Sequence, residues 1–314
     1  MKDLIDSALE ASVVGSFSRI GYVTRSRLGH WQSPTGLQGK RILLTGGSSG
    51  VGLAAAQMFA EAGARVAITG RDPGRLEAAA DSVGRHGEPA IALVADSSDL
   101  VQVRAVFEQA VGALGGLDVL VNNAGALVHE YRTSPQGFEE TYAVHVLSSF
   151  LLTGLAVDVM PAEGRVLTVT SGGMYSQSLR ADMQERPEGF DGVRAYAKAK
   201  RAQVALTQQW ARRLPDGPMF AVMHPGWADT PGVRTSLPTF RRVTGPILRT
   251  PSQGADTLVW LAGADVPSGR LWLDRRERSV LRVPRTQHDP EVAAELFDVV
   301  AAQVDRGRSR SAIT

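Results

Sequence analysis

From residue 40 onward, short apolar segments alternate with longer segments of helical character, and this alternation constrains the fold most strongly. The apolar segments lie at 41–45, 65–69, 90–95, 117–121, 165–170 and 219–224. The predicted helices lie at 51–62, 74–84, 99–113, 137–160 and 193–213. Buried strands that alternate with helices are typical of a parallel sheet covered on both faces. Because crossover connections are right-handed, the simplest α/β topology is a doubly wound parallel sheet.

The two ends of the chain stand outside this alternation. Apolar residues between Leu4 and Tyr22 recur at roughly helical spacing, and the sequence Ser33-Pro34-Thr35-Gly36 then ends the pattern. We therefore expect an N-terminal helical arm over 1–38, a main domain with substrate-loop insertions over 39–285, and a C-terminal helix and tail over 286–314. The arm either packs on the main domain or makes a peripheral membrane contact, since arginines lie beside its apolar residues.

Composition excludes several other classes of protein. The chain has 314 residues, 43% of them hydrophobic and 21% charged, which is ordinary for a chain with a sizeable core. It has no cysteine, so disulfides and thiolate metal sites are excluded. The six histidines show no metal-ligand spacing, and we predict no metal site. No apolar run is long enough for a transmembrane segment and no signal peptide is evident, so we expect a soluble, cytoplasmic protein.

Charge gives little evidence of a polymeric partner. The formal net charge is only +2, although the calculated pI is near 9.1. Arginines gather late in the chain, at 270, 275, 276, 278, 282 and 285 and again at 306, 308 and 310. No nucleic-acid-binding motif accompanies them, so we expect no nucleic-acid partner and interpret these arginines as solvated surface.

A glycine-rich turn follows the first predicted strand, with the sequence Thr45-Gly46-Gly47-Ser48-Ser49-Gly50-Val51-Gly52. A turn of this kind at a helix N-terminus presents free backbone N–H groups to a phosphate. It lacks the lysine of a P-loop. The same residues also fit the G-x-S-x-G pattern of hydrolases, but no oxyanion-hole motif precedes them. The turn favours a dinucleotide site over a hydrolase.

Arg71 stands where a dinucleotide-binding fold meets the adenosine ribose, about 20 residues after the last glycine of the turn. An arginine at this position suits a 2′-phosphate and therefore NADP(H), whereas NAD(H) is usually met by an acidic residue. Asp72 follows directly, and because it is acidic, NAD(H) stays a possible cofactor. The alternative is that Arg71 is one more surface arginine.

Tyr196 and Lys200 lie one turn apart on a predicted helix, on the same face. Only four of the 34 basic residues are lysines, and two of these stand in Tyr196-Ala197-Lys198-Ala199-Lys200. This usage indicates that Lys200 is required as a compact ammonium. An ammonium near the phenol would lower the pKa of Tyr196 and allow it to act as an acid or base. Ser171, at the end of a predicted strand, could hold the same substrate oxygen.

Taken together and in order, these motifs resemble the short-chain dehydrogenase/reductase family over about 40–285. They are Thr45-Gly46-x-x-x-Gly50-x-Gly52, Asn122-Asn123-Ala124-Gly125, Ser171, Tyr196-x-x-x-Lys200 and Pro225-Gly226. The resemblance implies a single Rossmann-type sheet and an NADP(H)-dependent oxidoreductase that interconverts a carbonyl and an alcohol. It also implies a homodimer or homotetramer that forms through the helices carrying His145 and Tyr196.

The resemblance assigns roles position by position. The pyrophosphate would lie on Gly46, Ser48, Ser49, Gly50, Val51 and Gly52, and the adenosine end on Arg71, Asp96 and Ser97. The ribose would lie by Asn123, Ala124 and Gly125, and the nicotinamide by Pro225, Gly226, Trp227 and Thr230. Tyr196 would be the proton donor, Lys200 its modifier and a ribose anchor, and Ser171 the carbonyl clamp.

His145 departs from the family pattern, which has asparagine at this position in support of a water-filled proton path. An imidazole can also hold a water, so we expect catalysis to be retained and include His145 among the catalytic residues. The alternative is a non-catalytic dinucleotide-binding or scaffold protein. The substrate pocket should form from 172–194 and 227–249. Met174, Leu237 and Phe240 there favour a small hydrophobic substrate.

Overall fold

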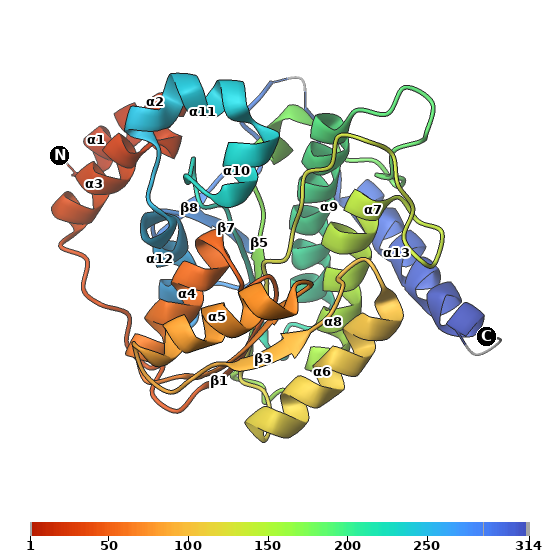
Figure 1. Ribbon diagram of the computed structural model, residues 1–314. Coiled ribbons are helices and arrows are strands. Elements are labelled where there is room, and N and C mark those ends of the chain that lie inside the picture. Colours follow the sequence, from red (N-terminus) through yellow and green to blue (C-terminus); the bar gives the residue numbers. More distant parts are fainter. Residues whose placement is uncertain (1, 285, 312–314) are drawn as a thin grey trace.

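A single eight-stranded sheet forms the centre of the computed structural model, which describes residues 2–284 and 286–311 (Figure 1). The strand order is β3-β2-β1-β4-β5-β6-β7-β8, and only the last pair, β7 with β8, is antiparallel. The strands are β1 (Arg41–Leu44), β2 (Arg65–Gly70), β3 (Ile91–Val94), β4 (Val119–Asn122), β5 (Arg165–Val169), β6 (Met219–Met223), β7 (Arg270–Leu273) and β8 (Arg276–Arg278). The predicted doubly wound α/β fold is confirmed.

Helices cover both faces of the sheet, as the continuous apolar strands require. On one face lie α4 (Gly50–Glu61), α5 (Pro73–Gly84) and α12 (Pro251–Leu261). On the other lie α6 (Leu100–Leu114), α8 (Ser148–Val157), α9 (Gly192–Arg213) and α13 (Pro290–Ser311). Each face has its own buried apolar cluster. Both faces of the sheet are thereby covered, and the connecting loops lie at the ends of its strands.

The helix expected over 137–160 is interrupted. It begins as the short α7 (Glu140–Tyr142), continues as a π-helical turn over Ala143–Leu147, and becomes α8. The N–H of Ser148 bonds to the carbonyl of Ala143, which places one extra residue in the turn. Glu140–Val157 is apolar and long enough to cross a membrane, but 67% of it is buried in the core, as expected of a core helix.

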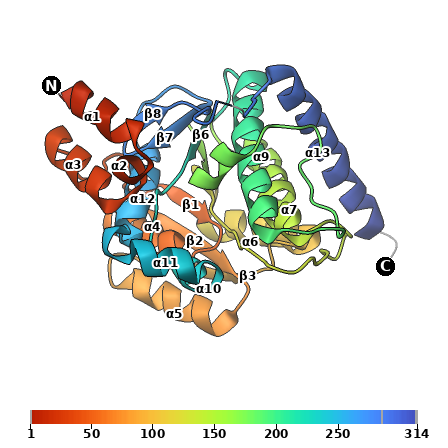
Figure 2. The same cartoon turned by 90° about the horizontal axis from the view of Figure 1, so that it is seen from above.

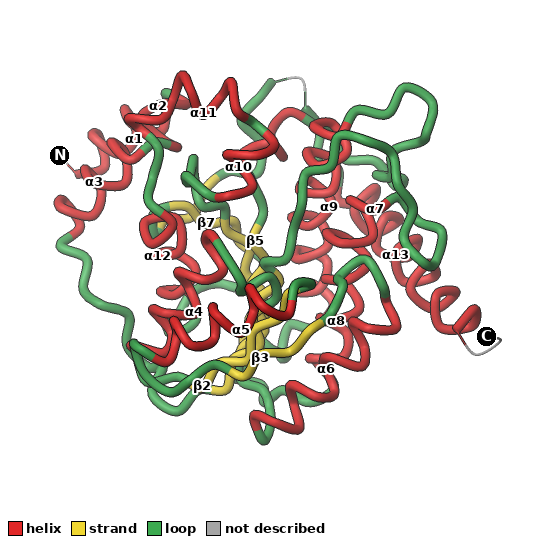
Figure 3. Tube along the Cα trace, viewed as in Figure 1, coloured by secondary structure: helices red, strands yellow, loops and turns green. Residues whose placement is uncertain are grey.

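Two long irregular segments, 123–139 and 177–191, and the short helices after β6 surround the carboxyl ends of the strands (Figure 3). The short helices are α10 (Pro231–Ser236) and α11 (Pro238–Thr244). These helices, α12 and the strands β7 and β8 were not anticipated. Three of the helices start at a proline, which suits the first helical turn. The segment 231–278 therefore completes the sheet and also covers one side of the strand ends.

The N-terminal arm consists of α1 (Lys2–Ala11), α2 (Val13–Phe17) and α3 (Arg19–Gly29), and it packs beside the β7–β8 edge (Figure 2). Its acidic residues pair with Arg276, Arg278 and Arg282, and the interpretation of the late arginines as solvated surface is wrong for Arg278 and Arg282, while Arg270 and Arg306 are exposed. The side chain of Arg278 is only 7% exposed and pairs with Asp6. Arg282 pairs with Glu10. Arg285 and the side chains of Arg308 and Arg310 lie outside the described part of the chain.

The C-terminal helix α13 packs across α9 and α8 on the side of the molecule opposite the arm (Figure 2). Phe297 contacts the rings of Phe150 and Trp210. The hydroxyl of Tyr142 donates a hydrogen bond to Gln303 at 2.8 Å. The face of α8 and α9 that the family resemblance assigns to subunit contact is thus covered by the chain's own terminal helix. The homodimer or homotetramer implied by the resemblance stays a prediction.

Candidate active site

A cavity of about 810 Å³ opens at the carboxyl ends of the central strands. This is the usual ligand position in a doubly wound sheet, and the volume lies within the range of ligand pockets. All of the residues predicted above to bind cofactor or to catalyse line it: Gly46, Ser48, Ser49, Gly50, Val51, Gly52, Arg71, Asp96, Ser97, Asn123, Ala124, Gly125, His145, Ser171, Tyr196, Lys200, Pro225, Gly226, Trp227 and Thr230. The fold therefore brings the predicted set together, and the individual roles remain predictions.

The glycine turn is built for close backbone packing. Gly46 has φ +68°, and a Cβ on Gly52 would lie only 2.2 Å from the Gly46 carbonyl oxygen. The Asn123 amide donates hydrogen bonds to the carbonyls of Thr45 and Gly46, at 2.9 and 3.0 Å, and holds the turn against β4. Ser49 occupies the N-cap of α4 without making a side-chain cap. The first N–H groups of α4 thus lack a side-chain cap and are suited to bind a phosphate.

Arg71 directly follows β2, and its side chain is 61% exposed. A carboxylate oxygen of the largely buried Glu140 is 3.7 Å from the Arg71 guanidinium, and an ion pair that is this long and involves an exposed arginine is weak. Asp72 caps α5 by accepting a hydrogen bond from the N–H of Arg75 at 3.0 Å. Its carboxylate therefore already has a structural use, and the side chain of Arg75 lines the cavity beside Arg71. Two arginines border the place where a 2′-phosphate would lie.

Ser171, Tyr196 and Lys200 meet in the middle of the cavity. Ser171 follows β5, while the other two lie on α9, with Lys200 Nζ 5.5 Å from the centroid of the Tyr196 ring. Burial raises the pKa of Tyr196, and a hydrogen bond with Ser171 lowers it in part. Burial lowers the pKa of Lys200 to about 7. The expected depression of the Tyr196 pKa by Lys200 is not observed in this structure, because desolvation dominates both groups.

The ammonium of Lys200 has two fixed partners. It donates to the carbonyl of Val169 at 2.7 Å and to the side-chain oxygen of Gln203 at 3.0 Å. The Gln203 amide in turn donates to the carbonyl of His145 at 2.9 Å. Gln203 is only 2% exposed. Sequence reasoning missed Gln203, although its place three residues after Lys200 puts it on the same helix face.

His145 lies in the π-helical turn and is fully buried. Its Nε2 atom is 2.9 Å from the carbonyl oxygen of Ala126, and its ring packs edge-on against Tyr196 with the centroids 5.3 Å apart. Burial, aided by the nearby Lys200, holds the pKa of His145 well below its usual value, so the ring is neutral. His145 therefore fixes the loop after β4 and supports the Tyr196 ring.

The remaining part of the cavity is apolar. It is bounded by Trp227, Leu237 and Phe240 and by the small residues that follow Ser171, as the two predicted pocket segments require. The Trp227 and Phe240 rings meet edge-on at 5.3 Å. Met174 is not part of this surface, because its side chain is fully buried in the core beneath. Among the described residues, no group of three His, Asp or Glu side chains could hold a metal ion.

A doubly wound sheet with a phosphate-binding turn and a Ser–Tyr–Lys centre defines a dinucleotide-binding oxidoreductase fold. The family model of the short chain dehydrogenases matches residues 40–239. Dehydrogenase/reductase SDR family member 12 of Bos taurus is 38% identical over 271 residues, which cover 83% of this chain and 85% of the relative. Retinol dehydrogenase 14 of Homo sapiens is 31% identical over 310 residues, covering 88% and 90%.

Solved structures agree with these relatives. A short-chain dehydrogenase of Burkholderia cenocepacia J2315, in complex with NADP, is 31% identical and has a TM-score of 0.61, covering 73% of this chain and 92% of that one. The chain belongs to the short-chain dehydrogenase/reductase family, and among its members it resembles dehydrogenase/reductase SDR family member 12.

Proposed function

We propose that this protein is an NADP(H)-dependent oxidoreductase that interconverts an uncharged, hydrophobic carbonyl compound and its alcohol. The observation that carries the proposal is the convergence of Ser171, Tyr196 and Lys200 in one cavity with an uncapped helix N-terminus. A dinucleotide seated on α4 would supply the hydride. The chain's own residues then have to hold the carbonyl oxygen and give it a proton.

Tyr196 is the proposed proton donor. In the reductive direction the carbonyl carbon takes the hydride, the carbonyl oxygen takes the phenolic proton, and the phenolate is later reprotonated from solvent. Ser171, whose hydrogen bond lowers the pKa of Tyr196 in part, would hold the same oxygen. A charged Lys200 would favour the phenolate, and its pKa of about 7 lets both of its protonation states occur near neutral pH.

The preference for NADP(H) over NAD(H) rests on Arg71 and Arg75. Both line the cavity, and the neighbouring Asp72 is engaged in capping α5. A 2′-phosphate would therefore meet two guanidinium groups, while NAD(H) would find no free carboxylate from Asp72 for its ribose.

The substrate class follows from the apolar end of the cavity. Beyond Tyr196, Lys200 and the neutral His145, its ionisable lining residues in the described chain all lie at the adenosine end: Arg71, Asp72, Arg75 and Asp96. A charged substrate would lose its hydration without gaining a partner. Trp227, Leu237 and Phe240 instead offer apolar surface to a hydrophobic ketone or aldehyde.

The test is a titration with NADPH and with NADH that follows nicotinamide fluorescence. Loss of a charge-assisted contact in Arg71→Ala should weaken NADPH binding about 10- to 100-fold and leave NADH binding nearly unchanged. Arg132→Ala, at a comparably exposed arginine, is the matched control. If neither nucleotide binds to the wild-type protein, the proposed function is wrong.

Two observations favour a second candidate, a dinucleotide-binding protein without turnover. His145 replaces the asparagine expected from the family resemblance, and Lys200 is engaged by Val169 and Gln203. NADPH binding without oxidation across a panel of neutral ketones and aldehydes would favour this candidate over the enzyme.

A further inference from the structure

The N-terminal arm reaches the floor of the active site through one residue, Phe17. Its carbonyl oxygen accepts a hydrogen bond from the N–H of Trp227 at 2.8 Å. Its ring lies against Gly172, where an added Cβ would be 2.8 Å from a ring carbon. The residues on either side of the cavity, the one after Ser171 and the one after Gly226, therefore both rest on the same arm residue.

The surroundings of Phe17 are closely packed. It is 5% exposed, and its ring packs edge-on against His224 and Trp227, with centroid separations of 4.8 and 6.0 Å. The guanidinium of Arg282 lies 4.9 Å from the centroid of the Phe17 ring. Gly226 has φ +68°, and a Cβ there would lie 2.6 Å from the Phe17 carbonyl oxygen. The close approach of the arm thus requires glycine at 226.

Arg249 ties this contact to the sheet. Its side chain is 1% exposed and donates to the carbonyls of Phe17 and Ser16, each at 2.9 Å, and to Asp274 at 2.6 Å. Its backbone N–H bonds to the carbonyl of Trp227 at 2.7 Å. A single buried arginine therefore holds the arm and the loop after β6 in one register.

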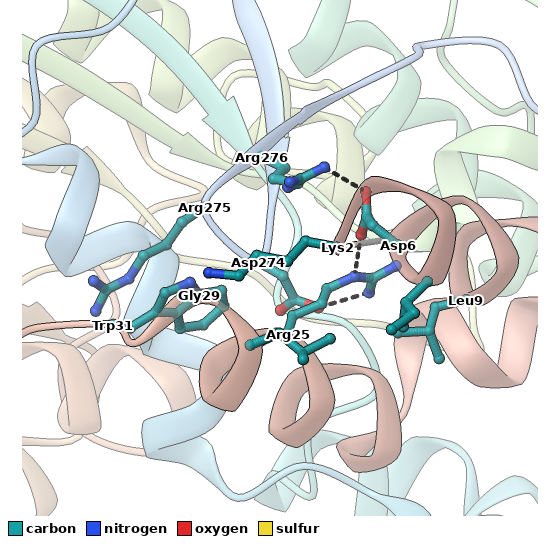
Figure 4. Close-up of a pocket in the computed structure, with 11 residues that line it drawn as sticks. Lys2, Asp6, Leu9, Arg25, Gly29, Trp31, Asp274, Arg275 and Arg276 are labelled. Atoms are coloured by element: carbon teal, nitrogen blue, oxygen red, sulfur yellow. Dashed lines mark hydrogen bonds and ion pairs between the residues drawn. The ribbon is translucent and has the colours of Figure 1, made fainter.

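Asp274, in the turn between β7 and β8, connects Arg249 to the N-terminal arm. Its buried carboxylate pairs with Arg249 and, at 2.8 Å, with Arg25 of α3. Figure 4 shows Arg25 between Asp6 and Asp274, beside a cavity of about 210 Å³ that remains under the arm. Asp274 and Arg275 have φ of 55° and 54°, a conformation that costs a residue other than glycine stability. The ion pairs hold the turn in this strained form.

We propose that Phe17 is a positioning residue of the active site, by which the docked N-terminal arm fixes the Gly226–Trp227 loop against Ser171–Gly172. The proposal rests on the proposed function in one respect, that the loop faces the nicotinamide. The adenosine end, with Arg71 and the glycine turn, has no contact with Phe17 among those described. Loss of the Phe17 ring should therefore misplace the reacting end and leave overall nucleotide affinity intact.

The experiment compares Phe17→Ala with Phe297→Ala in the full chain. Phe297 is matched in type and burial, at 7% exposed, but it lies on α13, packs against Phe150 and is not among the residues that line the cavity. We measure NADPH affinity, turnover of the best neutral ketone or aldehyde from the panel, and hydrogen exchange at the Trp227 amide. If no compound is turned over, the emission of bound NADPH at saturation replaces turnover as the report on the nicotinamide.

In Phe17→Ala we expect NADPH affinity within about threefold of wild type, because the anion-binding turn is intact. We expect turnover to fall about 10- to 100-fold, since small misplacements of reacting groups have effects of this size. Exchange at Trp227 should rise about tenfold or more. Phe17→Leu should return turnover and Trp227 exchange most of the way to their wild-type values. Phe297→Ala should lower thermal stability without changing turnover or Trp227 exchange.

The proposal is overturned if Phe17→Ala loses stability as Phe297→Ala does, while turnover and Trp227 exchange stay at their wild-type values. If wild-type protein does not bind NADPH, the proposed function fails instead. In that case Trp227 exchange still decides whether Phe17 holds the loop.

Discussion

Gln203 accepts a hydrogen bond from the ammonium of Lys200 at 3.0 Å, and this buried contact joins the catalytic helix to the π-helical turn. The amide nitrogen of Gln203 donates a hydrogen bond to the carbonyl oxygen of His145. A neutral amide can orient Lys200, but it does not take up and release protons in the neutral pH range. Lys200 is thus held by Gln203, a residue that does not itself line the cavity.

Replacement of Gln203 should alter the pH dependence of catalysis. In Gln203→Leu the ammonium loses an acceptor, so the pKa of Lys200 should fall further below about 7. In Gln203→Glu a carboxylate would stabilise the ammonium, and the pKa should rise. The corresponding limb of the profile of kcat/KM against pH should move in opposite directions in the two variants. Superimposable profiles would show that Gln203 has no influence on Lys200.

Tyr196→Phe should remove the proton donor and leave the cavity shape intact. We expect turnover to fall about 100- to 10,000-fold, the usual range for loss of general acid catalysis. NADPH affinity, measured by nicotinamide fluorescence, should stay close to the wild-type value. Retention of turnover in the variant would assign proton transfer to another group.

Two glycine-to-alanine variants should have opposite effects. In Gly52→Ala the new Cβ would lie 2.2 Å from the Gly46 carbonyl, so the turn must distort, at a cost of about 1–3 kcal/mol. Gly112 is an exposed residue within α6, and a Cβ there meets nothing within 4 Å. Gly112→Ala should stabilise the protein by about 0.5–1 kcal/mol. Urea unfolding and NADPH titration of both variants check this, and only Gly52→Ala should lose binding.

Buried histidines should make the protein less stable in mild acid. Burial lowers the pKa of His145 and His224 well below the usual value and that of His288 to about 4. As pH falls through 6.5, the unfolded chain therefore takes up protons before the folded one. The free energy of unfolding should decrease from pH 6.5 to 5.0, by up to about 1.4 kcal/mol per pH unit for each histidine. Urea unfolding across this range measures the slope.

His224 offers a variant for the same measurement. Neither of its ring nitrogens has a hydrogen-bond partner, and Phe17 and Tyr175 pack edge-on against it. His224→Phe removes both a titrating group and a buried polar group without a partner. The variant should be more stable at pH 7, by about 1–2 kcal/mol, and should show a shallower decrease in acid. An unchanged slope would exclude His224 as a source of the acid sensitivity.

Local sequence patterns predicted the sheet up to β6, and together with the family resemblance they predicted the cofactor and catalytic residues that line the cavity, but not the burial of Met174 in the core. This worked because buried parallel strands are recognisable as apolar runs, and because the glycine turn and Tyr196-x-x-x-Lys200 are compact motifs. The strand β8, Arg276–Arg278, could not be recognised in this way, since it is short and charged. It is stabilised by pairing with β7 and by ion pairs between its arginines and acidic residues of the arm.

The supporting residues were hidden for a different reason. Phe17, Arg249 and Asp274 lie far apart in the chain and come together only in the folded structure. Asp274 is a residue type that turns of positive φ favour, but Arg275 is not, and without a glycine the pair does not indicate such a turn. The π-helical turn at Ala143–Leu147 was missed because one additional residue barely changes the apolar pattern of a helix that is buried nearly all round.

The helix α13 has a consequence for the dependence of stability on protein concentration. Its Leu296, Val300 and Val304 are buried against the helices that carry His145 and Tyr196. A fold that completes this apolar surface by association would become less stable on dilution. Here the complementary surface is in the same chain, so its effective concentration is fixed by the covalent connection and does not change with dilution. The active-site helices should keep their packing at any protein concentration.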